Sequence, residues 1–195
     1  MRRLPIIVAA LLFPTAAFAH PDISHAAGLL HGFEHPLGGI DHILAMVAVG
    51  IFAFGLGGRA LWLVPLSFVG MMVVGFLLGA DGLNLPFVEL GIALSSVVIG
   101  GAAALGRPMP VVGAMVLVGI FALFHGHAHG AEMPASSGGA LYAAGFVAAT
   151  ALLHSAGIGA ASAISRLVGT HGRLIARIAG GALALGGFGV ALGWL

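Results

Sequence analysis

The stretch H-G-F-E-H-P-L-G-G-I-D-H-I-L-A-M-V-A-V-G, residues 31–50, decides how this chain folds. It begins as a polar segment with histidines, and from Pro36 onward it becomes an apolar run of the kind that crosses a membrane. That run nevertheless contains Asp41 and His42. A carboxylate near the centre of a membrane helix costs about 2.5 to 3.5 kcal/mol on insertion, so an ionisable pair in such a run indicates a functional site.

Helical geometry predicts how these polar residues are arranged. Pro36 suits the first position of a helix, because the N–H that it lacks would be unpaired there anyway. A helix that starts at Pro36 places His35 at its mouth and His42 two turns further on the same face, about 10 Å along the axis. A single histidine on a helix is often a packing residue. Two histidines with Asp41 at a membrane mouth favour a ligand site instead.

The composition places the chain in lipid. Of the 195 residues, 60% are hydrophobic and 7% are charged, which is too apolar for a soluble domain with one core. The net charge is +1 and lysine is absent, so there is no basic patch for nucleic acid. Cysteine is also absent, which excludes disulfides, thiolate metal sites and cysteine nucleophiles. A bound metal would therefore have nitrogen and oxygen ligands.

Residues 1–19 have the pattern of a secretory signal peptide. Two arginines precede a short apolar stretch, and residues 17–19 read Ala-Phe-Ala, an A-x-A cleavage site. Cleavage would make His20 the N-terminus, where its α-amine and imidazole could bind one metal ion together. An uncleaved anchor helix is the alternative, although the apolar stretch is short for a span and Pro14 interrupts it. A flexible terminus with an incidental histidine is the simpler interpretation of His20.

Six apolar runs of membrane length follow the leader, so we expect an all-α, polytopic membrane helix bundle in which residues 20–195 form one domain. A soluble helical bundle is the alternative that the composition disfavours. The expected spans cover residues 36–58, 60–80, 86–105, 110–128, 139–162 and 173–194.

The arginines predict the orientation of these spans. A cleaved signal puts the mature N-terminus outside, and six crossings then place the loops at Arg59, at Arg107 and at residues 166–177 in the cytoplasm. All five arginines of the mature chain lie in these loops, so the positive-inside rule supports the same threading. Both mature termini are then expected on the periplasmic side.

Small residues recur at a spacing of four in three of the expected spans. The pairs are Gly75 with Gly79, Gly157 with Ala161, and Gly189 with Gly193. This spacing lets membrane helices approach closely, so it predicts a compact bundle but no activity.

A second histidine motif, F-H-G-H-A-H-G-A-E, covers residues 124–132 at the outer end of the fourth span. If this segment is helical, His125 and His129 share a face at i, i+4, whereas His127 points elsewhere and Glu132 follows. An exposed histidine-rich loop is the alternative interpretation. Three histidines among five residues favour a metal role, since the loops of this chain are short.

Further polar residues lie within the third and fifth spans. Glu89 is about one turn into the third span, and an unpaired carboxylate in lipid needs a partner or a proton. His154 is past the midpoint of the fifth span, where it is either a packing residue or a metal ligand. We expect Ser95 and Ser96 to bond to helix carbonyls rather than to a substrate. The span directions place Glu89 and both histidine motifs at the same outer side of the bundle.

The motifs H-P-L-G-G-I-D-H at 35–42 and F-H-G-H-A-H-G-A-E at 124–132, with the leader and six spans, resemble the HupE/UreJ family of small membrane proteins. The resemblance implies a nickel or cobalt permease of the bacterial inner membrane that supplies a metalloenzyme such as hydrogenase or urease. It implies a transported metal rather than a permanently bound cofactor, and no enzymatic activity. The metal contacts that it implies are His35, Asp41, His42, His125, His127, His129 and Glu132. Three further candidate metal contacts do not come from the resemblance. Their depth in the spans adds Glu89 and His154, and the predicted new N-terminus adds His20.

The chemistry of the side chains is consistent with that function. Imidazole suits nickel and cobalt, and no soft thiolate is present to favour copper(I). Because no nucleotide-binding motif is present, we expect uptake to use the membrane potential or a coupled gradient. His20, His25, His31 and His35 are a candidate outer capture series. The alternative function is a membrane metal-binding accessory protein for metalloenzyme maturation that carries no flux. An intramembrane hydrolase is disfavoured, since no H-E-x-x-H motif occurs.

Overall fold

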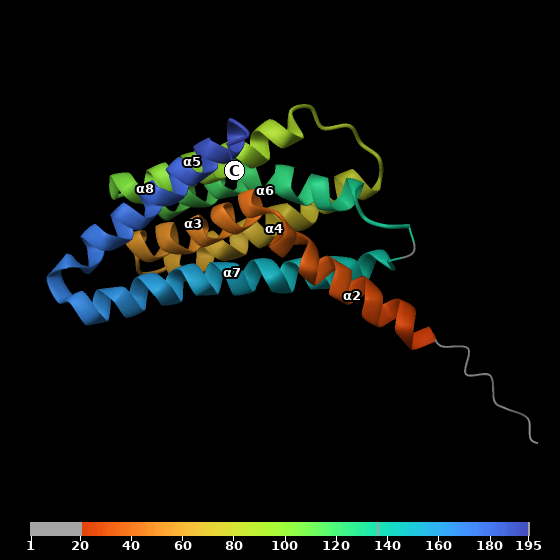
Figure 1. Cartoon of the computed structure of the whole chain (residues 1–195), viewed down its shortest axis with the longest axis horizontal. Helices are drawn as coiled ribbons and strands as arrows, with labels where there is room; N and C mark the ends of the chain where they lie inside the picture. Colours follow the sequence, from red (N-terminus) through yellow and green to blue (C-terminus); the bar gives the residue numbers. More distant parts are fainter. Residues whose placement is uncertain (1–20, 136, 195) are drawn as a thin grey trace, which may run out of the picture.

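The computed structural model describes residues 21–135 and 137–194, and side chains from residue 27 onward. This part of the chain forms helices joined by short turns and loops, so the prediction of an all-α fold is confirmed. The predicted signal peptide and His20 lie outside the described residues. The helices are α2 Pro21–Gly38, α3 Ile40–Leu56, α4 Ala60–Ala80, α5 Val88–Leu105, α6 Val111–Ala131, α7 Gly139–Val168, the 3-10 turn η1 Gly169–His171, and α8 Gly172–Ala191 (Figure 1).

Several of these helices are long and apolar enough to cross a membrane. By length and composition, α4, α5, α6 and the 53-residue stretch Gly139–Ala191 qualify among the described residues, and the bent pair α2–α3 raises the number to five. The stretch Gly139–Ala191 contains both α7 and α8, and the chain reverses direction between them (Figure 1). Helices α3 to α8 therefore correspond to the six predicted apolar runs, with boundaries that differ by a few residues.

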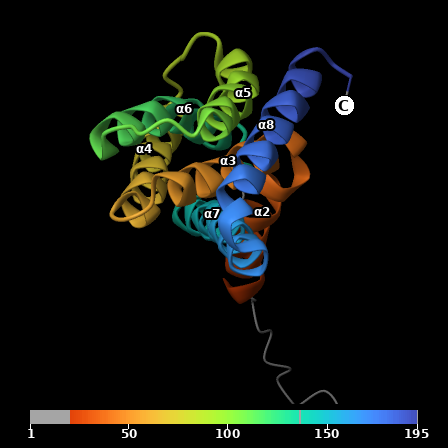
Figure 2. The ribbon, with the colours of Figure 1, turned by 90° about the vertical axis from the view of Figure 1, so that its left-hand side faces the viewer.

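Helix α3 is the centre of the bundle and contacts every other α-helix (Figure 2). Residues 48–53 are buried without interruption, although a helix at the surface would expose one face in each turn. The outward faces of the surrounding helices carry large apolar side chains such as Leu66, Ile120 and Leu185, which suits contact with lipid. The helix that contains Asp41 and His42 is thus held on all sides.

Glycines bring α4 and α6 into backbone contact. An added Cβ on Gly75 or Gly79 would meet main-chain atoms of α6, and one on Gly126 or Gly130 would meet main-chain atoms of α4. Because the two helices meet through small residues, they can approach far closer than larger side chains would allow. The predicted packing role of Gly75 and Gly79 is confirmed. This contact fixes the end of α6 that carries the second histidine motif.

The other two small-residue pairs have different outcomes. Gly157 of α7 packs against the main chain of α3 at Val47 and Gly50, as expected for a helix contact. Gly193 lies beyond the end of α8 with φ +69°, and a Cβ there would meet nothing within 4 Å. The following N–H, of Trp194, donates to the carbonyl of Gly189 at 2.9 Å. The prediction was wrong for Gly193, because this glycine serves the C-terminal turn of a helix rather than a helix contact.

The prediction that one straight span begins at Pro36 was wrong. Pro36 lies inside α2, and the chain bends by 84° between α2 and α3. The bend is at Gly39, whose extended backbone (φ −102°, ψ 119°) separates the two helices. The polar approach is helical because Gly32 and Gly145 let α2 and α7 pack at backbone distance, which local sequence patterns do not reveal.

Charged residues are segregated along the bundle. The loops α3–α4, α5–α6 and α7–α8 lie at one end, and α2 with the α4–α5 and α6–α7 loops lies at the other (Figure 1). The arginines of the described residues lie in the first set of loops or in the helix turns next to them. At the arginine end, Arg177 Nε donates to the carbonyl of Ala104 at 2.8 Å, next to the end of α5. Within the described residues, the histidine motifs are therefore at the end opposite to the arginines.

Candidate metal site

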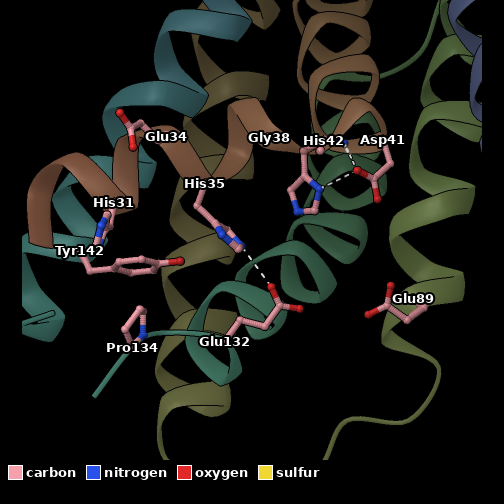
Figure 3. A pocket seen from close by; sticks show the side chains of 11 residues that line it. His31, Glu34, His35, Gly38, Asp41, His42, Glu89, Glu132, Pro134 and Tyr142 are labelled. Atoms are coloured by element: carbon pink, nitrogen blue, oxygen red, sulfur yellow. Dashed lines mark hydrogen bonds and ion pairs between the residues drawn. The ribbon is translucent and has the colours of Figure 1, made fainter. Parts of the chain in front are cut away.

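An open pocket of about 610 Å³ lies at this second end, beside the bend between α2 and α3. Four of the six carboxylates of the chain line it, and no arginine of the described residues does. Such a concentration of negative charge attracts cations and raises their local concentration. The lining residues are His31, Glu34, His35, Gly38, Gly39, Asp41, His42, Glu89, Glu132, Pro134 and Tyr142 (Figure 3).

The bend brings His35 and His42 together from two different helices. The predicted geometry, with both residues on one face of one helix, was therefore wrong. Both rings nevertheless contact His129, with ring centroids 4.9 Å from His35 and 5.1 Å from His42. The bend at Gly39 thus brings the rings of His35 and His42 to a common neighbour, His129. A straight helix would keep the two residues about 10 Å apart along its axis.

The three histidines of α6 divide as predicted for a helix. His125 and His129 both face α3, and the ring centroid of His125 is 4.7 Å from that of His42. His127 points to the α4–α5 loop, where its Nε2 donates to the carbonyl of Leu83 at 2.6 Å. All three side chains are buried, so the alternative of an exposed histidine-rich loop was wrong.

Asp41 orients the ring of His42. The Oδ1 of Asp41 accepts a hydrogen bond from Nδ1 of His42 at 2.9 Å and another from the backbone N–H of His42 at 2.8 Å. A carboxylate only accepts, so the ring proton is on Nδ1 and the lone pair is on Nε2. A carboxylate that holds a histidine in this way is a common partner of metal-binding imidazoles.

Two further carboxylates face the same pocket from α5 and from the end of α6. Glu132 Oε2 pairs with Nε2 of His35 at 3.1 Å, and Glu132 directly follows α6. Glu89, in the first turn of α5, lies across the pocket from His35 (Figure 3). The structure therefore gathers Glu89, Glu132 and both histidine motifs, which the sequence placed at one side of the bundle.

Next to the pocket lies a group of buried imidazole nitrogens that have no hydrogen-bond partner in the described chain. A buried polar atom without a hydrogen bond costs about 1–3 kcal/mol, so such a group is unusual unless it serves a ligand. His129 contributes both of its ring nitrogens, although it lies at the centre of the group. Within the described residues, the unpartnered buried nitrogens are His42 Nε2, His125 Nδ1, His127 Nδ1, His129 Nδ1 and Nε2, and His154 Nδ1 and Nε2.

His154 lies apart from the pocket. It is buried in α7 with its ring edge-on to Phe68 at 5.1 Å, and Phe68 also contacts His125 at 5.8 Å. The ring of Phe68 thus lies against both His125 and His154, and His154 does not line the pocket. Among the described residues, no three or more His, Asp or Glu side chains are arranged to hold one metal ion together. The arrangement supplies neighbouring pairs of potential ligands rather than a closed cage.

Sequence reasoning missed part of the site. Tyr142 of α7 lines the pocket, and its buried hydroxyl has no hydrogen-bond partner in the described chain. Glu34 also lines the pocket, next to His35. Tyr142 could have been predicted from its position near the outer end of the fifth span, at the depth of the histidine motifs. Glu34 could have been predicted as a carboxylate within the histidine-bearing stretch at residues 31–50.

A bundle of membrane-capable helices with a carboxylate-lined pocket above buried histidines defines a small multi-pass membrane protein with a candidate cation site. The chain belongs to the HupE/UreJ family, because the family model described as HupE / UreJ protein matches residues 8–191. Protein HupE of Rhizobium leguminosarum bv. viciae is 48% identical over 191 residues, which cover 98% of each chain. No solved structure shows significant similarity to the chain.

Proposed function

We propose that this protein is a secondary transporter that imports a divalent transition metal, nickel or cobalt, across the bacterial inner membrane. The observation that carries this proposal is the group of imidazole nitrogens of His42, His125 and His129 that have no hydrogen-bond partner in the described chain. His42 lines the carboxylate-rich pocket, and the rings of His125 and His129 contact that of His42. Imidazole and carboxylate ligands without thiolates suit nickel and cobalt. Membership in the HupE/UreJ family supports the same function, and hydrogenase or urease maturation proteins are the proposed recipients.

The proposed route has an outer, a middle and an inner step. His20, His25, His31 and His35 form an outer capture series, and the side chains of His31 and His35, which lie in the described part, line the pocket. Glu89, Glu132 and Asp41 attract the ion, and His35 and His129 pass it to the pair His42–His125. His127 borders this step, and His154 is the inner step. Few ligands at each step permit release, whereas a closed four-ligand site retains its metal.

For the orientation, we propose that α3 to α8 are six spans, with the arginine loops in the cytoplasm and both mature termini in the periplasm. The segregation of arginine to one end supports this arrangement. The pocket then opens to the periplasm. A membrane potential of about 100 mV, negative inside, favours inward movement of a divalent cation by about 4.6 kcal/mol.

An accessory protein that binds metal without transporting it is the second candidate. The pocket favours this candidate in one respect, because its lining ends at His42 and does not include His125 or His154. Such a protein would store metal or deliver it to a maturation partner. It would bind nickel or cobalt with the same residues but carry no flux.

Flux into proteoliposomes that contain only this protein separates the two functions. The liposomes enclose a metal-sensitive dye, and a potassium gradient with valinomycin sets a potential that is negative inside. We expect entry of nickel or cobalt that increases with the potential, and much slower entry with His42→Ala protein. Metal binding by equilibrium dialysis without any flux would instead identify the accessory function.

A further inference from the structure

Two neighbouring serines of α5 provide a natural comparison at the histidine group. Ser95 and Ser96 are both fully buried, and each bonds to the carbonyl three residues earlier, as predicted from the sequence. The distances are 2.6 Å from Ser95 Oγ to the carbonyl oxygen of Ile92 and 3.4 Å from Ser96 Oγ to that of Ala93. Ser95 makes an additional contact, since its Oγ lies 2.9 Å from Nε2 of His125.

The hydroxyl of Ser95 carries one proton, so its two contacts restrict the protonation of His125. Two oxygens 2.6 Å apart repel each other unless a proton lies between them, and a carbonyl has none to give. The Ser95 proton therefore lies on the bond to Ile92. Nε2 of His125 must then supply the proton for its own bond to Ser95 Oγ.

A neutral imidazole with its proton on Nε2 has its lone pair on Nδ1. The Nδ1 of His125 is buried and has no hydrogen-bond partner in the described chain. His42 is held in the opposite way, because Asp41 keeps the proton on Nδ1 and leaves Nε2 with the lone pair. The two rings meet at an interplanar angle of 87°. Each ring thus has one nitrogen fixed by the protein and the other left for a ligand.

We propose that Ser95 is a positioning residue that selects the tautomer of His125 and presents its Nδ1 to a divalent metal ion shared with Nε2 of His42. Ser95 does not contact the metal. Ser95 fixes the ring proton of His125 as Asp41 fixes that of His42. Its hydroxyl is a neutral acceptor, so the buried part of the site does not need a second carboxylate. The role in metal binding rests on the proposed function, whereas the choice of tautomer does not.

Nitrogen NMR of histidine-labelled protein in lipid nanodiscs tests the tautomer directly. Protonated and unprotonated ring nitrogens have well-separated shifts, and the His125 signals are identified by their loss in His125→Gln protein. We expect the Nε2–H form alone in the wild type and in Ser96→Ala, and a mixture of both forms in Ser95→Ala. Ser95→Thr keeps the hydroxyl and should restore the Nε2–H form. Persistence of the pure Nε2–H form in Ser95→Ala would overturn the proposal.

Metal binding tests the consequence of the tautomer. Loss of a residue that orients a metal-binding histidine typically weakens binding about 10–100-fold, so Ser95→Ala should raise the nickel Kd by that factor. Ser96→Ala should keep the wild-type Kd, and equal losses in the two variants would contradict the proposal. If Ser95→Ala does not fold, Ser95→Cys replaces it, because a thiol is similar in size and accepts hydrogen bonds only weakly. If the wild type binds neither nickel nor cobalt, the proposed function fails, while the NMR result still decides the role of Ser95.

Discussion

The rings of His42 and His125 meet edge to face with their centroids 4.7 Å apart, although the two residues belong to separate motifs on α3 and α6. Each ring has one nitrogen bonded to the protein and another that is buried without a hydrogen-bond partner among the described residues. His42 lines the pocket, and His125 contacts Phe68, which also contacts His154. In the proposed transport route, this pair is therefore the step at which a small change should have the largest effect.

Alanine at either position of this pair should reduce nickel and cobalt uptake at least about 10-fold, because the remaining imidazole cannot hold the ion alone. Insertion into the membrane should be unaffected, since a polar side chain is removed. The matched control is His171→Ala, which removes an exposed histidine from η1 at the arginine end. Uptake of labelled metal by cells with equal membrane levels of each variant is the measurement. Wild-type rates in both His42→Ala and His125→Ala would leave these histidines as packing residues.

At the end of α6 that carries the histidines, uptake should depend on the packing of α6 against α4 as well as on the metal ligands. Alanine at Gly126 would place its Cβ against main-chain atoms of Met72, which cannot move without displacing α4. We expect a loss of about 1–3 kcal/mol in the free energy of unfolding, and slower uptake because His125 and His127 move with α6.

Gly70→Ala is the matched control for this packing prediction. A Cβ there meets nothing within 4 Å, and alanine should stabilise the helix by roughly 0.5–1 kcal/mol. Unfolding of both variants by SDS in mixed micelles gives the comparison. Equal stability of Gly126→Ala and the wild type would show that α4 and α6 are not in fixed contact.

The apolar runs were the most predictable part of the fold. Length and composition were sufficient to locate helices α3 to α8, because a membrane span needs about 20 apolar residues whatever its neighbours are. The helix α2 was not predictable in this way, since its mixed polar sequence is helical through contact with α7. The bend at Gly39 was not predicted either, because Pro36 was compatible with the start of a helix and no other sequence signal indicated a break.

The candidate site was predictable in its residues but not in its geometry. Span direction placed Glu89 and both motifs at one end, and helical periodicity separated His127 from His125 and His129. Ser95 could not be recognised, because its bond to Ile92 is the ordinary behaviour of a serine in a helix. Only the tertiary contact between α5 and α6 shows that its oxygen also reaches a histidine.

The orientation of the bundle can be tested with cysteines, because the chain contains none. Asn84 lies exposed in the α4–α5 loop at the end with the pocket, and Thr170 lies exposed in η1 at the arginine end. In intact spheroplasts, a membrane-impermeant maleimide should label Asn84→Cys and not Thr170→Cys. Permeabilised cells should label both, which controls for reactivity. Labelling of Thr170→Cys from the outside would reverse the proposed orientation.

The two glycines at the bend allow a test of the Asp41–His42 bond that leaves both partners in place. A Cβ on Gly39 would lie 2.6 Å from Asp41 Oδ1 and 3.0 Å from His42 Nδ1, whereas one on Gly38 would meet nothing within 4 Å. The backbone of Gly39 (φ −102°, ψ 119°) is open to any residue, so alanine there causes no backbone strain. The crowded atoms are the ends of side chains, which can swing away at little cost in stability.

Gly39→Ala should therefore break the bond between Asp41 and His42 while the protein stays folded. We expect uptake to fall about 10-fold or more, as for other losses of a group that orients a metal-binding histidine, with an unchanged midpoint of unfolding. Gly38→Ala should transport at the wild-type rate. The measurements are labelled nickel uptake at equal membrane levels and SDS unfolding of each purified variant. Normal uptake by Gly39→Ala would mean that the site works without the carboxylate holding His42, and that Asp41 acts only through its charge.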